Sequence, residues 1–243
     1  MSPRHDLSLT RGWAADGTRL LTEALEALDD EGFTAPSLLP GWTRAHVAAH
    51  VARNAEALGR LAAWARTGEE TPMYPSPEQR DADVEASARQ QPGDLRHDVA
   101  STAADLALAF DALEGSAWDA RVRVRQGTEV PARVLPWLRA REVWLHAVDL
   151  GTGADLAGAP ADLLDELAHD ITGGLSRKDG CPALELRPSD RDSAWQLGPR
   201  EGDAGGRVSV QGSVADLVLW LAGRSDGAAL TSAGPLPVLP AWL

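Results

Sequence analysis

Four segments before residue 155 carry apolar residues at helical spacing, and this pattern constrains the fold more than any other feature. The segments cover residues 7–30, 44–64, 94–114 and 132–150. Such periodicity is typical of amphipathic helices that bury one face. Proline- and glycine-containing stretches separate the helices, and connections of this kind favour antiparallel neighbours. The sequence therefore predicts an antiparallel four-helix bundle.

Two local signals refine this prediction. Thr43 precedes the second helical segment and is expected to be its N-cap, with Trp42 and Val47 placed as a hydrophobic staple. The polar segment 66–83 is rich in proline and breaks the helical pattern. We therefore expect no regular element of the bundle there.

The pattern changes after about residue 155. A helical segment near 160–173 is followed by short stretches with alternating apolar residues, ALELRP, AWQLG and RVSVQG. Alternation of this kind predicts strands, and a last helix is expected near 213–223. The tail GPLPVLPAWL is too rich in proline for regular structure. The prediction is an α+β protein with a helical bundle in residues 1–155 and a small α+β domain in residues 156–243.

Charge and composition exclude several classes of partner. The net charge of −13 is unsuited to nucleic acid or to an anionic membrane surface, since both attract basic proteins. The N-terminus lacks the apolar stretch of a secretory signal. Cys181 is the single cysteine, which excludes an internal disulfide framework and a zinc site built from cysteines. We expect a cytoplasmic protein that acts on small molecules, without a nucleic acid or membrane partner, as a monomer.

Histidine and carboxylate side chains fall on the apolar faces of two predicted helices. His46 and His50 are four residues apart in the second helix, and Glu142 and His146 have the same spacing in the fourth. One helical turn separates each pair, so the side chains of a pair point the same way. His50, Glu142 and His146 would supply two nitrogens and one oxygen, a set that is typical of catalytic zinc with a fourth position left open.

Two further features bear on this set. Asp149 lies one turn beyond His146 and would orient a metal-ligating side chain without binding the metal itself. His46 lies at the edge of the apolar face. In the alternative interpretation, Glu142 pairs with His146 alone or with Arg139 or Arg141, and no metal is involved. Spacing alone leaves both interpretations open.

Several blocks of the sequence resemble the mycothiol-dependent maleylpyruvate isomerases, which lie within the wider DinB-like superfamily of four-helix metalloproteins. These blocks follow the order of the family and span nearly the whole chain: SLLPGWTRAHVAAHVARNAEAL, WARTGEETPMYPSPEQR, REVWLHAVDLG, LAGRSDG and the closing AWL. The resemblance implies a DinB-like bundle followed by a small α+β domain. It also implies one Zn²⁺ held by His50, Glu142 and His146.

The same resemblance implies a reaction. The family converts maleylpyruvate, a dicarboxylate with a cis double bond, to fumarylpyruvate in gentisate catabolism, with mycothiol as the thiol cofactor. Reversible addition of a thiolate lets the double bond rotate, and coordination to zinc deprotonates a thiol. The resemblance assigns a catalytic role to Arg224, whose fork of donors suits a carboxylate or a developing negative charge. Tyr74, the single tyrosine, lies in a distinctive loop of the family and is a candidate for the substrate or thiol pocket.

Three other functions remain open at this point. The same scaffold would serve another mycothiol-dependent S-transferase, which would lack selectivity for the dicarboxylate. A bundle that binds zinc only for stability would be a non-catalytic protein. Zinc-bound water would instead support hydrolysis.

Overall fold

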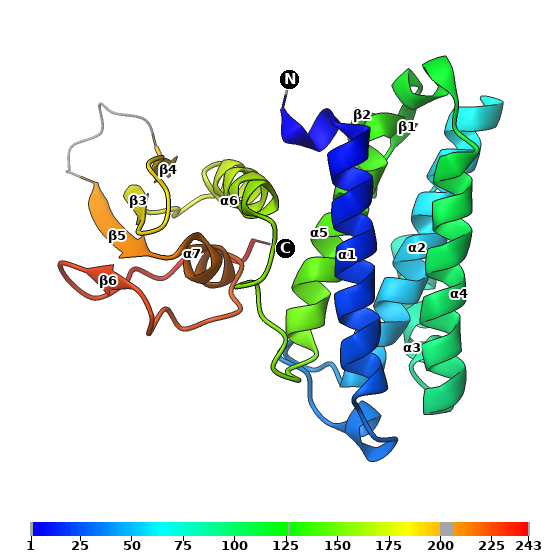
Figure 1. Ribbon diagram of the computed structural model, residues 1–243, viewed down its shortest axis with the longest axis horizontal. Coiled ribbons are helices and arrows are strands. Elements are labelled where there is room, and N and C mark those ends of the chain that lie inside the picture. The colour runs from blue at the N-terminus through cyan, green and yellow to red at the C-terminus, as the bar shows by residue number, and fades with distance from the viewer. Residues whose placement is uncertain (1, 126, 200–206, 243) are drawn as a thin grey trace. The chain divides into compact units, whose positions relative to one another are not determined.

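The computed structural model describes residues 2–125, 127–199 and 207–242, and the chain divides into two compact units (Figure 1). The first unit is Met1–Ala154 and the second is Asp155–Leu243. The first is helical, and the second is α+β with a mixed four-stranded sheet. The predicted fold class, a helical bundle followed by an α+β part, is confirmed. None of the described helices has the length and apolar character needed to cross a membrane.

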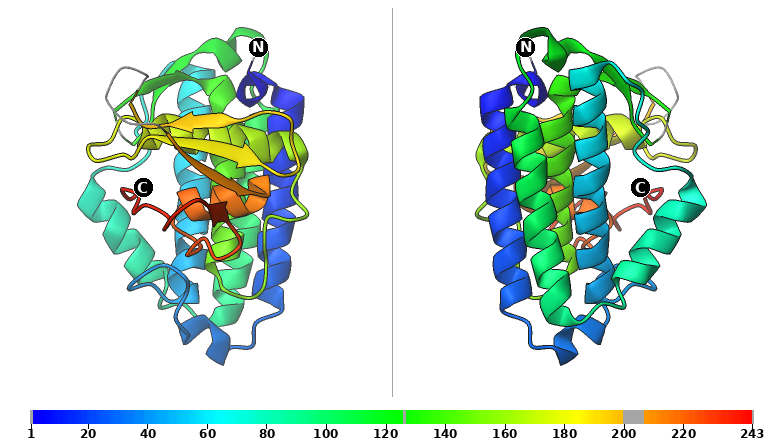
Figure 2. Two further views of the ribbon diagram at one scale, coloured as in Figure 1. Left: turned by 90° about the vertical axis from the view of Figure 1, so that its left-hand side faces the viewer. Right: turned by 90° about the vertical axis from the view of Figure 1, so that its right-hand side faces the viewer.

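Four long helices form the bundle of the first unit. They are α1 (Leu7–Glu26), α2 (Arg44–Thr67), α4 (Pro92–Asp111) and α5 (Leu135–Asp149). Helix α1 packs on α5 and α4, and α2 packs on α4 and α5. The helices lie side by side in Figure 2. The first helix ends before the predicted residue 30, since the chain continues there into a short 3-10 helix, Glu31–Thr34. Three more 3-10 helices are Pro3–His5, Gly115–Asp119 and Ala132–Val134.

The start of α2 is fixed by a reciprocal cap. The backbone N–H of His46 donates to the Thr43 hydroxyl, as the sequence predicts for an N-cap, and the Thr43 N–H donates to His46 Nδ1 at 3.2 Å. The helix ends at Gly68, whose positive φ of 76° favours glycine over other residues. Together these two signals set the length of the helix that carries His50.

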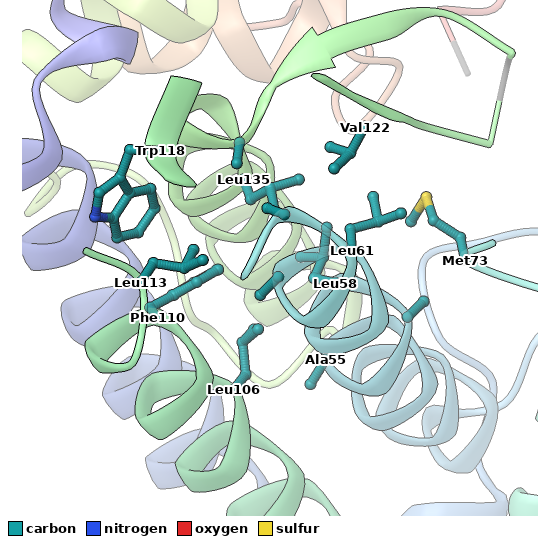
Figure 3. Close-up of a cluster of buried hydrophobic side chains, with 14 residues drawn as sticks. Ala55, Leu58, Leu61, Met73, Leu106, Phe110, Leu113, Trp118, Val122 and Leu135 are labelled. Atoms are coloured by element: carbon teal, nitrogen blue, oxygen red, sulfur yellow. The ribbon is translucent and has the colours of Figure 1, made fainter. Parts of the chain in front are cut away.

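A cluster of buried apolar side chains fills one end of the bundle. Figure 3 shows side chains from α2, α4, α5 and the strand β1 (Arg121–Arg123) converging there, among them Leu58, Leu61, Phe110, Val122 and Leu135. Trp118 closes the cluster, with its ring 6.0 Å from that of Phe110. Burial of this apolar surface holds α2 and α5 in a defined mutual register.

Two elements lie where the helical pattern gave no indication of them. Helix α3 (Pro77–Ser87) occupies part of segment 66–83 and packs against α2 outside the four-helix bundle (Figure 2). The break in the helical pattern gave no indication of this helix, which the Ser76 hydroxyl caps and Pro77 starts. Strands β1 and β2 (Glu129–Pro131) form an antiparallel hairpin that is too short to leave a readable alternation.

The second unit builds a four-stranded sheet in the order β4-β3-β5-β6. Strands β3 and β5 are parallel, with Leu186 opposite Val210, and the other pairs are antiparallel. Helices α6 and α7 cover one face of the sheet (Figures 1 and 2). The bounds are α6 (Ala161–Leu175), β3 (Leu184–Pro188), β4 (Trp195–Leu197), β5 (Val208–Gly212), α7 (Val214–Leu221) and β6 (Thr231–Ser232).

The three predicted strands and two predicted helices of this unit are all present. The two-residue strand β6 was not predicted, because a pair of residues shows no periodicity. The described part of the tail, residues 234–242, has no regular element, as its prolines predict. The indole of Trp242 is nevertheless buried, and Lys178 donates to the Trp242 carbonyl at 2.7 Å.

Candidate metal centre

Helices α2 and α5 bring His50, Glu142 and His146 together inside the first unit. His50 Nε2 lies 3.0 Å from Glu142 Oε2, and His146 Nε2 lies 3.4 Å from the same oxygen. One ligand atom from each residue lies within 4.8 Å of the others. The imidazole rings meet edge to face, with centroids 4.7 Å apart. Three donor atoms therefore converge on one point from two helices.

The spacing of these atoms suits a small divalent cation. Tetrahedral zinc with bonds of about 2.0–2.1 Å places its ligand atoms about 3.3–3.4 Å from one another. The two distances to Glu142 Oε2, 3.0 and 3.4 Å, lie close to that value. Two neutral imidazoles and one carboxylate leave a bound dication with net positive charge. The residues fit a divalent metal ion that keeps a further position for a ligand.

Glu142 is held as a carboxylate despite its burial. Burial alone would raise the pKa of Glu142, but hydrogen bonds from His146 and His50 hold it well below its usual range. Its second oxygen, Oε1, lies 3.6 Å from an Arg141 guanidinium nitrogen. The pairings of Glu142 with His146 and Arg141 that the sequence left open are both present, and His50 adds a third contact. Arg139 instead donates to the Val51 carbonyl at 2.8 Å.

The two histidines have opposite surroundings. Burial lowers the pKa of His50, and the neighbouring His146 and Arg80 charges lower it further against the effect of Glu142. Burial also disfavours charge on His146, but hydrogen bonds to Asp149 and Glu142 raise its pKa. Asp149 Oδ2 accepts from His146 Nδ1 at 2.8 Å, and no part of Asp149 is exposed. In a neutral His146 with its proton on Nδ1, Nε2 would offer its lone pair to a cation instead of donating to Glu142.

Asp149→Asn is expected to weaken zinc binding by about 10- to 100-fold, because a neutral amide holds the His146 N–H less strongly. Competition with a chromogenic chelator measures the change. Asp98→Asn is the matched control, since Asp98 is a partly buried carboxylate that pairs with Arg53 at 2.7 Å. Equal zinc affinities in the wild type and Asp149→Asn would contradict the positioning role of Asp149.

The other residues singled out in the sequence are not members of the three-residue cluster. His46 belongs to the N-terminal cap of α2, where its Nδ1 lies 2.7 Å from the Thr43 hydroxyl, and its Nε2 lies 3.3 Å from Glu85. Arg224 follows α7 in the second unit and donates to the Ala222 carbonyl at 2.6 Å. Tyr74 lines a pocket of the first unit, and burial and the Glu142 charge raise the pKa of its hydroxyl.

Sequence reasoning missed Arg80, which contacts His50 from the far side of its ring. Arg80 Nη2 lies 3.1 Å from His50 Nδ1. The residue belongs to α3, the helix that the pattern did not indicate. The serine–proline pair at positions 76–77 is a start signal that would have revealed the helix. Nothing in the sequence pairs Arg80 with His50.

Comparisons with known proteins agree with this architecture. A family model described as the mycothiol maleylpyruvate isomerase N-terminal domain matches residues 14–151, and one described as the MDMPI C-terminal domain matches residues 158–241. The crystal structure of the mycothiol-dependent maleylpyruvate isomerase is 38% identical, with a TM-score of 0.92 over 100% of both chains. The crystal structure of a histidine-to-alanine mutant of that isomerase is also 38% identical in sequence, and its TM-score is 0.91 over 100% of both chains.

The search of curated proteins returned no match. The two family models together cover most of the sequence, and the similarity to the solved isomerase extends over the full length. The resemblance noted in the sequence is thereby confirmed, and the chain belongs to the mycothiol maleylpyruvate isomerase family.

Proposed function

We propose that this protein isomerises maleylpyruvate to fumarylpyruvate with mycothiol as the thiol cofactor and Zn²⁺ as the metal. The observation that carries the proposal is the convergence of His50 Nε2, Glu142 Oε2 and His146 Nε2 in a member of this family. A simple metal-free core would not need three ionisable side chains at one buried point, since burying such groups costs several kcal/mol unless they are well paired.

The chemistry needs a sulfur nucleophile. Rotation about a carbon–carbon double bond requires the bond to become single for a moment, and reversible addition of a thiolate achieves this. The described chain offers Cys181 as its single thiol, and burial raises the pKa of that thiol, which keeps it protonated. An external thiol is therefore proposed, and a zinc ion bound to the three ligands would supply the charge that keeps its sulfur ionised at neutral pH.

The residues of the chain prepare the centre for this task. Glu142 stays ionised and directs Oε2 at the convergence point. Asp149 keeps a proton on His146 Nδ1, so the other nitrogen of that ring is free to act as a ligand. The His50 side chain is buried, and the Trp42 ring lies 5.5 Å from its ring. Low access to water strengthens every charge interaction at the centre.

Arg224 is proposed to stabilise the negative charge that develops on the conjugated carbonyl of the substrate. A guanidinium is always charged and presents several donors in one plane, which suits an oxyanion or a carboxylate. The proposal for Arg224 rests on the family resemblance of the G-R-S-D-G segment, residues 223–227.

An absorbance assay with maleylpyruvate tests the function. Turnover is expected only when both mycothiol and the metal are present, and removal of the metal with a chelator is expected to reduce the rate to background. Readdition of Zn²⁺ should restore it. A rate that is unchanged by chelation would remove the metal from the reaction.

Two comparisons in the same assay separate the alternatives. Conjugation of a panel of electrophiles to the thiol, without isomerisation of maleylpyruvate, would identify an S-transferase. Consumption of substrate without added thiol would point to hydrolysis. The proposal expects isomerisation that depends strictly on the thiol.

A further inference from the structure

A groove of about 520 Å³ opens between α1 and α4 in the first unit. The two helices run side by side in the right-hand view of Figure 2, with α1 in blue and α4 in green. The volume lies within the range of about 300–1,000 Å³ that is typical of small-molecule sites. The described residues that line the groove do not include His50, Glu142 or His146. The groove is therefore a feature of the bundle apart from the proposed ligand set.

Most of the lining is apolar. Leu106 and Phe110 of α4 are buried and also belong to the hydrophobic cluster at one end of the bundle. Six alanines complete the walls: Ala14, Ala15, Ala100, Ala103, Ala104 and Ala107. The side chain of alanine is a single methyl group, and these methyls leave an apolar channel along the two helices. Such a channel suits an aliphatic chain.

The charged residues among the described lining residues are all arginines: Arg11, Arg19 and Arg139. Arg11 and Arg19 are exposed side chains of α1, where Arg11 pairs with Asp111 and Arg19 pairs with Glu23 at 3.2 Å. Arg139 differs from both, because it comes from α5 and is only 2% exposed. The groove thus combines apolar walls with one buried cation.

The guanidinium of Arg139 has a donor that the described protein does not use. Its Nη1 donates to the Val51 carbonyl at 2.8 Å and to Asn54 Oδ1 at 3.0 Å. Its Nη2 is buried, and no group of the described residues accepts a hydrogen bond from it. Burial lowers the pKa of Arg139 to about 10 against the opposing effect of the Glu142 charge, so the guanidinium stays charged at neutral pH. A buried charged donor without an acceptor is unfavourable, and an anion in the groove would supply the acceptor.

Contacts between α5 and α1 place Arg139 toward one end of the groove. The ring of Trp137 meets that of Trp13, and Val143 packs against Gly17. Arg139 lies between these two contacts along α5, and beyond its level the lining of α1 continues for about two turns, or about 11 Å. An extended aliphatic chain advances about 1.25 Å per carbon–carbon bond. A chain of about ten carbons therefore matches the length of the apolar channel.

We propose that this groove binds a single-chain aliphatic carboxylate of about ten carbons, with its carboxylate at Arg139 and its chain along the alanines. Burial of each methylene in the channel is favourable, and a guanidinium binds a carboxylate through charge-assisted hydrogen bonds. The net charge of −13 disfavours an anionic bilayer, so the ligand is a free molecule and not a membrane lipid. The inference is independent of the proposed isomerase activity.

Titration calorimetry with decanoate tests the site through changes in the ligand. Decanol has the same chain without the charge and should bind about 10- to 100-fold more weakly, since it loses the charge-assisted hydrogen bond. Butyrate keeps the charge and should bind more than about 100-fold more weakly, because six fewer methylenes are buried. Equal affinities for decanoate and decanol would overturn the role of Arg139. A wild-type protein that does not bind decanoate would overturn the site.

Ala104→Phe tests the location of the site, because the larger side chain would occupy the groove. Ala104 is exposed on α4, so the substitution leaves the core of the bundle intact, and decanoate affinity should fall at least about 10-fold. Ala86→Phe is the matched control, since Ala86 is an exposed alanine of α3 that does not line the groove. It should bind decanoate as the wild type does. Equal affinities in Ala104→Phe and the wild type would place the ligand elsewhere and overturn the proposal.

Arg139→Met tests the cation itself. Its affinity for decanoate should fall to that for decanol, while its affinity for decanol should equal the wild-type value. Circular dichroism checks the fold of this variant, which loses two hydrogen bonds to α2. If it does not fold, the pair of ligands and Ala104→Phe still decide the question. Sedimentation with phosphatidylglycerol vesicles should leave the wild type in the supernatant, and co-sedimentation would overturn the assignment to a free ligand.

Discussion

His50→Ala is expected to raise the zinc dissociation constant by about 100- to 1,000-fold, because one of three protein ligands is lost. Thiol-dependent turnover of maleylpyruvate should fall to background with it. Competition with a chelator gives the first quantity and the absorbance assay the second. The helix should still form, since Ala48, Ala49 and Ala52 already occupy buried positions around residue 50 and alanine favours helix.

His46→Ala provides the matched control one turn earlier on α2. His46 Nδ1 serves the cap by accepting from the Thr43 backbone N–H, so its loss should cost about 1 kcal/mol of stability. Zinc affinity should stay at the wild-type value. If His46→Ala lost the metal and His50→Ala kept it, the proposed ligand set would be wrong. If His50→Ala unfolded the protein when His46→Ala did not, a purely structural metal would be favoured.

Trp137→Ala is expected to cost about 3–5 kcal/mol in the free energy of unfolding. The side chain on α5 is 1% exposed, and its ring meets that of Trp13 on α1 edge to face at 6.0 Å. Truncation would open a large cavity where α1 and α5 pack. At roughly 2–4 °C per kcal/mol, the Tm of a chain of this length should fall by about 6–20 °C. Thermal melting followed by circular dichroism measures the shift.

Leu108→Ala is the control for this prediction, because Leu108 on α4 is 65% exposed. The change in stability should stay within about 0.5 kcal/mol. A similar loss in the two variants would mean that truncation of any large apolar side chain destabilises the protein, and that the α1–α5 contact has no special weight.

Much of the bundle could be predicted from the sequence because its information is local. Helical spacing of apolar residues identifies each of the four long helices, and Thr43 marks the first residue before α2. Helix α3 was not predicted because its residues are mostly polar and show little apolar periodicity, although Ser76 and Pro77 signal its start. The hairpin β1–β2 and strand β6 were not predicted because strands of two or three residues are too short to show an alternating pattern.

The contacts of the candidate metal centre were also only partly predictable from the sequence. The spacing of Glu142 and His146 places them on one face of a single helix, so their proximity follows from helix geometry alone. Arg80 and His50 are 30 residues apart in the chain, and no periodicity relates them. Their contact depends on how α3 packs against α2.

By itself, the sequence determined which residues share a helix face and therefore which polar groups are buried, since helical periodicity is a property of neighbours along the chain. Only the tertiary structure decided that His50 meets Glu142 across 92 residues and that Arg80 faces the far side of its ring. The register of one helix against another is set by the packing of many side chains at once. No short stretch of sequence contains that information.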